Sequence, residues 1–235
     1  MEAPGYEQLQ QTVPLPEYAR GKIWQPGQYP QEMEVAEKDG QKYFIKDEEK
    51  GKGLVMPYIL ADTVAEEIGL DIEMSYDEEA GKIIRPEIED APTDEYIPGV
   101  SGLFDKLAGR PLGPEPEELY EASALKYFIA DTDVAPNIVV NEESAEPIDF
   151  QRAGATAKHF YSQFLDDLEE VFDHLNRDFS QQEFEQVISS YAQQADIQGL
   201  EENLREGLES HETFRSDRRE DAVVRKTLEN FERFR

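Results

Sequence analysis

Apolar and polar positions alternate in the first third of the chain. Met33 and Val35 are separated by polar residues, residues 38–40 read Lys-Asp-Gly, and an apolar run resumes over 43–46. Alternation on both sides of an Asp-Gly turn is typical of a β-hairpin. The pattern therefore predicts two antiparallel strands joined at this turn.

A change of period follows the predicted hairpin. Apolar residues recur at helical spacing over 58–68, and Gly69 is suited to the end of a helix. Short apolar runs at 72–74 and 83–85 then predict a second pair of strands. The segment 21–86 is expected to form a small lobe of hairpin, helix and hairpin.

The remaining chain divides by composition and period. Residues 1–20 show no period and are expected to form an extended arm, and residues 87–116, rich in proline and glycine, a connecting segment. Apolar stripes over 119–129 and 160–175 keep the helical period, so residues 117–235 are expected to form a mainly helical lobe. Ser180 and Glu183 form a capping box, which predicts the start of a further helix. The fold class predicted is α+β, with two lobes and a small antiparallel sheet in the first.

Charge narrows the range of partners. The 235 residues contain 23 Lys and Arg against 53 Asp and Glu, a formal net charge of −30. Such a surface repels nucleic acids and anionic membranes. The acids are spread among regularly spaced apolar residues, which favours a folded acidic surface over a disordered tail. In this respect the chain resembles proteins of salt-loving archaea or their viruses.

Several classes of site and location are excluded or disfavoured. The chain has no cysteine, which removes disulfides, thiolate zinc sites and cysteine nucleophiles. Its first residues lack the basic and apolar regions of a secretory signal, and no run reaches the roughly 18 apolar residues of a membrane span. We expect a cytoplasmic protein without a membrane span.

The chemistry-bearing residues occur in a suggestive order. Lys46 closes the second strand of the hairpin, and Asp131 and Asp133 follow a predicted helix. Asn137 and Asp149 accompany two short predicted strands, at 137–141 and 147–150. Transfer of a phosphoryl group needs a cation on the nucleotide phosphates, oxygen ligands for magnesium and a carboxylate facing the acceptor. The chain supplies these groups in the order that kinases use.

Three motifs carry a family resemblance. The segments 43–46, 129–140 and 147–154 read Tyr-Phe-Ile-Lys, Ile-Ala-Asp-Thr-Asp-Val-Ala-Pro-Asn-Ile-Val-Val and Pro-Ile-Asp-Phe-Gln-Arg-Ala-Gly. They resemble the atypical protein-kinase-like superfamily, whose phosphoinositide lipid kinases and HipA-type protein kinases are the most similar members. The resemblance implies a two-lobed fold that uses ATP and Mg²⁺.

The resemblance implies nucleotide-binding roles in the first lobe. Lys46 corresponds to the lysine that holds the nucleotide phosphates, and its partner on the following helix corresponds to Glu66 or Asp62. Gly27 lies where the family has a glycine loop over the phosphates, although this sequence has only one glycine there.

The resemblance also implies catalytic and metal-binding roles in the second lobe. Asn137 and Asp149 correspond to the magnesium ligands, and Asp133 or Asp131 to the residue that orients or deprotonates the acceptor hydroxyl. Family loops place the asparagine five residues after the catalytic aspartate. Here it comes four residues after Asp133 and six after Asp131, so the sequence leaves both as candidates.

Two functions are therefore expected from the resemblance. The first is an ATP- and magnesium-dependent kinase acting on a protein serine or threonine or on a small alcohol. The alternative is a catalytically inactive kinase-like protein that binds or assembles partners, which the short interval and the single glycine favour. A third reading takes the order of motifs as chance and the chain as an acidic assembly component.

Overall fold

The computed structural model is a mixed α/β protein with small antiparallel sheets and six α-helices among the residues that it describes. The chain divides into two compact units, residues 1–55 with 73–89 and residues 56–72 with 90–235. The described residues are 4–9, 12–14, 33–47, 55–72, 74–77, 79–86, 113–132, 138–140, 144–147, 150, 152–155, 159–209 and 220–235.

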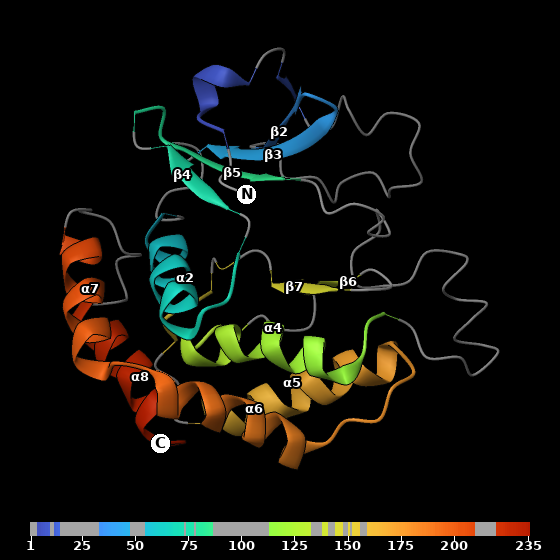
Figure 1. The fold of residues 1–235 in the computed structure, drawn as a ribbon, viewed down its shortest axis with the longest axis vertical. Coiled ribbons are helices and arrows are strands. Elements are labelled where there is room, and N and C mark those ends of the chain that lie inside the picture. The colour runs from blue at the N-terminus through green and yellow to red at the C-terminus, as the bar shows by residue number, and fades with distance from the viewer. Residues whose placement is uncertain are drawn as a thin grey trace. The chain divides into compact units, whose positions relative to one another are not determined.

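The first unit is built on one antiparallel sheet with the strand order β1-β2-β3-β5-β4 (Figure 1). A 3-10 helix, η1 (Tyr6–Gln8), precedes it. The strands are β1 (Val13–Pro14), β2 (Met33–Lys38), β3 (Gln41–Asp47), β4 (Ser75–Asp77) and β5 (Lys82–Pro86).

The β2–β3 hairpin confirms its prediction from sequence. Lys38 pairs with Gln41, and the two residues between them, Asp39 and Gly40, have φ of 54° and 87°. Two positive φ angles define the type I′ turn, which matches the twist of the flanking strands and favours an Asp-Gly sequence. Local turn chemistry therefore sets the register of this hairpin.

The second predicted strand pair needs a correction at its first strand. The sequence predicts that strand at 72–74, but β4 begins at Ser75, which pairs with Ile84 of β5. The apolar residues at 72 and 74 belong to the connection from the preceding helix. Apolar content alone could not separate this connection from the strand that follows it.

The described part of residues 1–20 contributes to the first unit. Val13 of β1 pairs with Val35 of β2, and Leu9 is buried in a cluster with Ala36, Ile45 and Ile84. The arm predicted for this region therefore supplies one strand and one core side chain. No periodicity in the sequence indicated these contacts.

A hydrogen bond to Asp77 connects the beginning of the chain with β4. Its Oδ2 accepts a hydrogen bond of 2.8 Å from the Tyr6 backbone N–H, and its Oδ1 accepts one of 2.9 Å from the Ala80 N–H. The N–H groups of Ala80 and then Tyr6 hold the pKa of Asp77 below its ordinary value of 3.8.

We expect this pair of hydrogen bonds to make stability depend on acid. A carboxylate with a lowered folded pKa stabilises the fold above its unfolded pKa, and this contribution is lost as pH falls through the folded pKa. Urea unfolding at neutral pH should find Asp77→Asn less stable than the parent, with the difference shrinking as pH falls below the ordinary pKa of 3.8 and through the lowered folded pKa. A difference that stays constant across this range would contradict the assignment.

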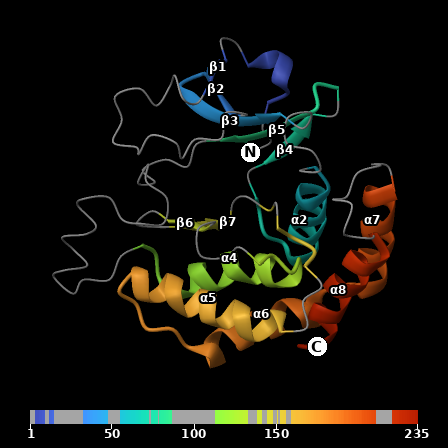
Figure 2. The same ribbon diagram turned by 180° about the vertical axis from the view of Figure 1, so that it is seen from behind.

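In the second unit, helices α5, α6 and α8 pack around α4, as Figures 1 and 2 show from opposite sides. Contacts join α4 to α5, α6, α8 and β7. The elements are α2 (Val55–Ile68), α4 (Pro116–Phe128), β6 (Ile138–Val140), β7 (Ala145–Pro147), α5 (Phe160–His174), α6 (Gln181–Gln194), α7 (Ile197–Glu209) and α8 (Glu220–Glu232).

The helix predicted at 58–68 is α2, which begins three residues earlier. From Met56 onward it belongs by its contacts to the second unit, although the lobe predicted over 21–86 includes it. It ends as expected at Gly69, whose φ is 69°. The Gly69 N–H donates to Glu66 and the Leu70 N–H to Ala65, the two bonds of a Schellman motif.

Two further predictions for the helical part can be compared with the structure. Ser180 caps α6, because its Oγ accepts a hydrogen bond of 3.3 Å from the Glu183 N–H, as the capping-box pattern predicts. The strand expected at 147–150 lies earlier, since β7 ends at Pro147.

Aromatic side chains form much of the core of the second unit. The Tyr127 ring has aromatic neighbours on α4, α5 and α6 and near the end of the chain. Its burial raises the pKa of the Tyr127 hydroxyl. None of the described helices is both long enough and apolar enough to cross a membrane. The fully buried aromatic residues are Tyr120, Tyr127, Phe128, Phe150, Phe164, Phe172, Phe184 and Phe231.

Candidate functional site

Lys46 lies on the central strand of the first unit, one residue before β3 ends. It pairs with Met33 of β2 and Ile83 of β5. Side chains alternate along a strand, so Lys46 lies on the opposite face from its neighbour Ile45, which belongs to the Leu9 cluster. Its side chain is half-buried. A lysine in this setting has a backbone position fixed by strands on both sides.

Glu66 lies on the exposed surface of α2, in the second unit, one turn after Asp62. Partial desolvation raises the pKa of Asp62, and the neighbouring carboxylate of Glu66 raises it further. Carboxylates at this spacing repel each other. The pairing of Lys46 with either acid stays a prediction.

The end of α4 brings a buried ion pair to the start of the second motif. The Lys126 Nζ lies 2.9 Å from Asp131 Oδ2, and both side chains are fully buried. The Asp131 N–H also donates to the Lys126 carbonyl, at 2.9 Å. Asp131 is thus held by its backbone and its carboxylate to the last turn of α4.

The turn that connects the two residues has a left-handed residue other than glycine. Ala130 has a φ of 52°, and its N–H donates to the Tyr127 carbonyl at 3.1 Å. With the bond from Asp131 to Lys126, this makes a Schellman motif. In such motifs an apolar contact often joins the two positions that Lys126 and Asp131 occupy here. An ion pair replaces it in this protein.

The segment after Asp149 is attached to the same helix end. The Gly154 N–H donates to the Ile129 carbonyl at 2.7 Å, and the Ala155 N–H donates to the Ala130 carbonyl at 3.0 Å. These bonds use carbonyl groups that the end of α4 leaves without helical partners. The two motifs that bear the predicted catalytic and metal residues are therefore joined by their backbones.

The ring of Phe150, in the last motif, contacts side chains of two helices. The Lys126 Nζ lies 5.1 Å from the centre of the Phe150 ring, a distance typical of a cation–π interaction. Tyr58 of α2 contacts the same ring edge-on, with centroids 5.6 Å apart. Side chains of α2 and α4 thus both contact the buried ring of Phe150, the residue after Asp149.

Helix α8 supports the end of α4 from another side. Asn230 Nδ2 donates to the carbonyls of Tyr127 and Phe128, at 2.8 and 3.2 Å. Phe231 stacks on Phe128 with ring centres 3.8 Å apart. The last turn of α4 is held by side chains far later in the sequence, so the position of this turn depends on α8.

The ribbon of β6 and β7 covers the end of one motif and the start of the other, and it contacts α4 through β7 (Figures 1 and 2). Ile138 pairs with Pro147, so the start of β6 and the end of β7 meet at one end of the ribbon. Asn137 precedes Ile138 in the sequence, and Asp149 follows Pro147 by two residues. Gly27, Asp133, Asn137 and Asp149 themselves lie outside the described residues.

Lys126 is the residue of this region that the sequence pattern did not single out. Every residue from Ala122 to Asp131 is buried, and the Lys126 side chain is among them. A helix that is buried on every side has no solvent face for a charge, so a lysine inside it requires a partner. That requirement, with an aspartate five residues later, is the signal that could have identified the pair.

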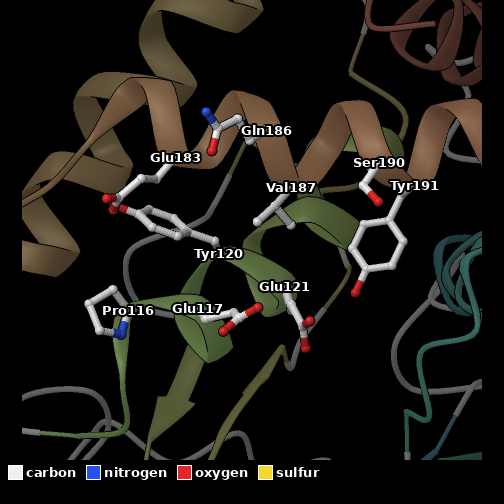
Figure 3. A pocket seen from close by; sticks show the side chains of 9 residues that line it. All are labelled: Pro116, Glu117, Tyr120, Glu121, Glu183, Gln186, Val187, Ser190 and Tyr191. Atoms are coloured by element: carbon white, nitrogen blue, oxygen red, sulfur yellow. The ribbon is translucent and has the colours of Figure 1, made fainter.

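A separate cavity of about 450 Å³ lies between α4 and α6 (Figure 3). Burial raises the pKa of Tyr191 to about 12, and the carboxylate of Glu121, toward which Tyr191 points, adds to this shift. None of the predicted site residues lines this cavity. Among the described residues, no group of three or more acids and histidines is placed to hold a metal ion. The lining residues are Pro116, Glu117, Tyr120, Glu121, Glu183, Gln186, Val187, Ser190 and Tyr191.

Comparisons with known proteins leave the family open. No protein-family model matches the chain, and no curated protein matches it. Among solved structures, the crystal structure of the choline kinase LicA from Streptococcus pneumoniae is similar over 96% of this chain and 94% of that one. The sequence identity is 14% and the TM-score is 0.31. A TM-score at this level does not establish a common fold.

Proposed function

We propose that the protein is a kinase-like phosphotransferase, which moves the terminal phosphoryl group of ATP, bound with Mg²⁺, to an alcohol hydroxyl. The observation that carries the proposal is the junction around Lys126. This side chain pairs with Asp131 at the start of one motif and lies over Phe150, next to Asp149, in the other. A phosphotransferase needs its acceptor-facing carboxylate and its magnesium ligands in one place.

The buried ion pair favours different roles for the two candidate aspartates. The carboxylate of Asp131 is fully buried and held by Lys126, so it cannot meet a substrate hydroxyl unless that pair opens. We therefore propose Asp133 as the residue that faces the acceptor. Asp131 then belongs to the scaffold that carries the loop.

Asn137 and Asp149 are the proposed magnesium ligands. Amide and carboxylate oxygens are ligands that Mg²⁺ accepts. In the sequence, Asn137 precedes Ile138 and Asp149 follows Pro147 by two residues, and Ile138 and Pro147 are paired in the β6–β7 ribbon. When bound, Mg²⁺ would neutralise charge that develops on the phosphate oxygens. Lys46 is proposed to hold the nucleotide phosphates, with Glu66 of α2 as its partner and Gly27 as part of the loop that covers them.

The proposed reaction is a single displacement. The acceptor oxygen forms a bond to the γ-phosphorus while the bond from that phosphorus to the bridging oxygen of ADP breaks. The hydroxyl proton passes to the carboxylate of Asp133, and the products are a phosphate monoester and ADP. Lys46 stabilises the nucleotide phosphates by its charge.

The class of acceptor follows in part from charge. A net charge of −30 disfavours approach to an anionic membrane. We propose a protein serine or threonine, or a small alcohol in solution, as the acceptor. A kinase-like protein that binds nucleotide without turnover is the second candidate, because Asn137 follows Asp133 by four residues where the family has five.

Thermal unfolding in high salt, with and without Mg-ATP, tests the nucleotide site. We expect a rise in Tm of about 5–10 °C at nucleotide concentrations near a hundred times Kd. The rise should disappear in Asp149→Ala, in Lys46→Ala and when EDTA removes the metal. The control is Asp173→Ala, which removes an exposed carboxylate of α5 and should leave the rise intact.

Formation of ADP separates the two candidate functions. Turnover with a serine- and threonine-containing peptide mixture or with small alcohols, lost in Asp133→Asn, would support the transferase. A rise in Tm without any turnover would favour the binding protein. A folded parent that shows no rise at all would exclude both.

A further inference from the structure

The end of α4 combines two features that a helix end does not need for stability alone. Ala130 adopts a left-handed conformation, which a glycine would adopt with less strain. Lys126 and Asp131 form a fully buried ion pair where an apolar contact is common. Replacing a buried ion pair by apolar side chains of similar volume is often neutral or stabilising. The pair therefore calls for an explanation besides stability.

The contacts of Lys126 indicate such an explanation. Its ammonium group touches both Asp131 and the ring of Phe150, at 2.9 and 5.1 Å. An apolar side chain at this position could fill the space, but it could not fix a carboxylate and an aromatic face at the same time. The Ile129 and Ala130 carbonyls, which receive the N–H groups of Gly154 and Ala155, lie in the same turn.

We propose that Lys126 is a positioning residue, which sets the approach of the Asp133–Asn137 loop and of Asp149 to one Mg-nucleotide. The inference rests on the proposed function and deepens it. Lys126 touches neither nucleotide nor acceptor. It acts through Asp131, two residues before Asp133, and through Phe150, the residue after Asp149. Tyr58, which packs on the same ring, extends the linkage to α2.

The competing explanation is that the pair only anchors the fold. The two explanations differ in what happens when both charges are removed together. A fold anchor that is replaced by well-packed apolar side chains leaves binding of nucleotide unchanged. If the pair has a positioning role, its replacement leaves the fold intact but weakens the coupling between the binding of Mg²⁺ and the binding of nucleotide.

The test uses the full chain and the double variant Lys126→Met/Asp131→Leu. We expect its Tm without ligand to stay within a few degrees of the parent. We expect the Mg²⁺ concentration for half-maximal ATP binding, measured by calorimetry, to rise at least about tenfold. The matched control is Arg205→Met/Asp221→Leu, which removes a largely exposed pair of opposite charges at 2.8 Å. It should leave the Mg²⁺ midpoint unchanged.

The outcomes separate the two proposals. An unchanged Mg²⁺ midpoint in the double variant, with the parent binding Mg-ATP, overturns the positioning role and leaves the proposed function standing. A parent that does not bind Mg-ATP overturns both. If the double variant does not fold, Asp131→Glu decides, because it keeps the charge pair and displaces the loop by one methylene. A shifted midpoint in this variant supports the role of Lys126, and an unchanged one overturns it.

Discussion

Replacing Phe231 by alanine is expected to lower the free energy of unfolding of the second unit by about 3–5 kcal/mol. Phe231 is fully buried and stacks on Phe128 at a centroid distance of 3.8 Å. Its removal deletes a large apolar side chain and leaves a cavity against the last turn of α4. Urea unfolding in high salt, followed by far-UV circular dichroism, measures this loss.

Two neighbouring changes make the result specific. Glu232→Ala alters the next residue, which is exposed, and should change the free energy of unfolding by less than about 0.5 kcal/mol. Phe231→Leu keeps part of the apolar volume and should lie between the parent and alanine. Equal stability of Phe231→Ala and the parent would show that α8 does not hold α4 in solution.

Phe231 matters for the proposed site because α8 holds the last turn of α4, which leads to Asp131. Asn230, its neighbour, donates to the carbonyls of Tyr127 and Phe128, just before the turn to Asp131. Loss of the α8 contact should therefore weaken Mg-ATP binding as well as stability. The same variant links packing at the C-terminal helix with the proposed function.

Sequence predicted best the features that depend on neighbours in the chain. The Asp39-Gly40 turn, the end of α2 at Gly69 and the Ser180 cap of α6 each follow from local backbone chemistry. Each one is seen in the structure. The start of β4 differs from the prediction, because the apolar residues after Gly69 could belong either to a strand or to the connection before it.

Features that depend on distant contacts could not be predicted. Nothing in the pattern around Leu9 indicates that it joins the core of the first sheet, since its partners lie on strands much later in the sequence. Membership of α2 in the second unit has the same origin. An amphipathic helix reveals that one face is buried, but the pattern does not name the element that covers it.

The candidate site shows the same limit. Spacing from Asn137 left Asp131 and Asp133 as alternatives, and the ion pair between Lys126 and Asp131 is the observation on which the proposal of Asp133 rests. A lysine in a predicted helix is ordinarily assigned to the solvent face. The partner that keeps Lys126 buried lies beyond the end of the helix, in a turn whose left-handed residue is alanine. No glycine in the sequence marks this turn.

Lys126→Met alone is expected to lower the free energy of unfolding by about 3–5 kcal/mol, because it leaves the carboxylate of Asp131 buried without its cation. Asp131→Leu alone should be destabilising for the corresponding reason, since the ammonium group loses its counter-charge. The double variant should recover most of the loss. Denaturant unfolding of all four proteins forms a double-mutant cycle.

The size of the interaction energy in this cycle identifies the kind of pair. A strongly non-additive cycle, with two unstable single variants and a stable double variant, means that the two charges stabilise the fold only as a pair. Additive losses would mean that each side chain is held by separate contacts. The two residues would then contribute independently to stability. With the non-additive result, stability no longer accounts for the ion pair. This result is the one that the proposed positioning role of Lys126 requires.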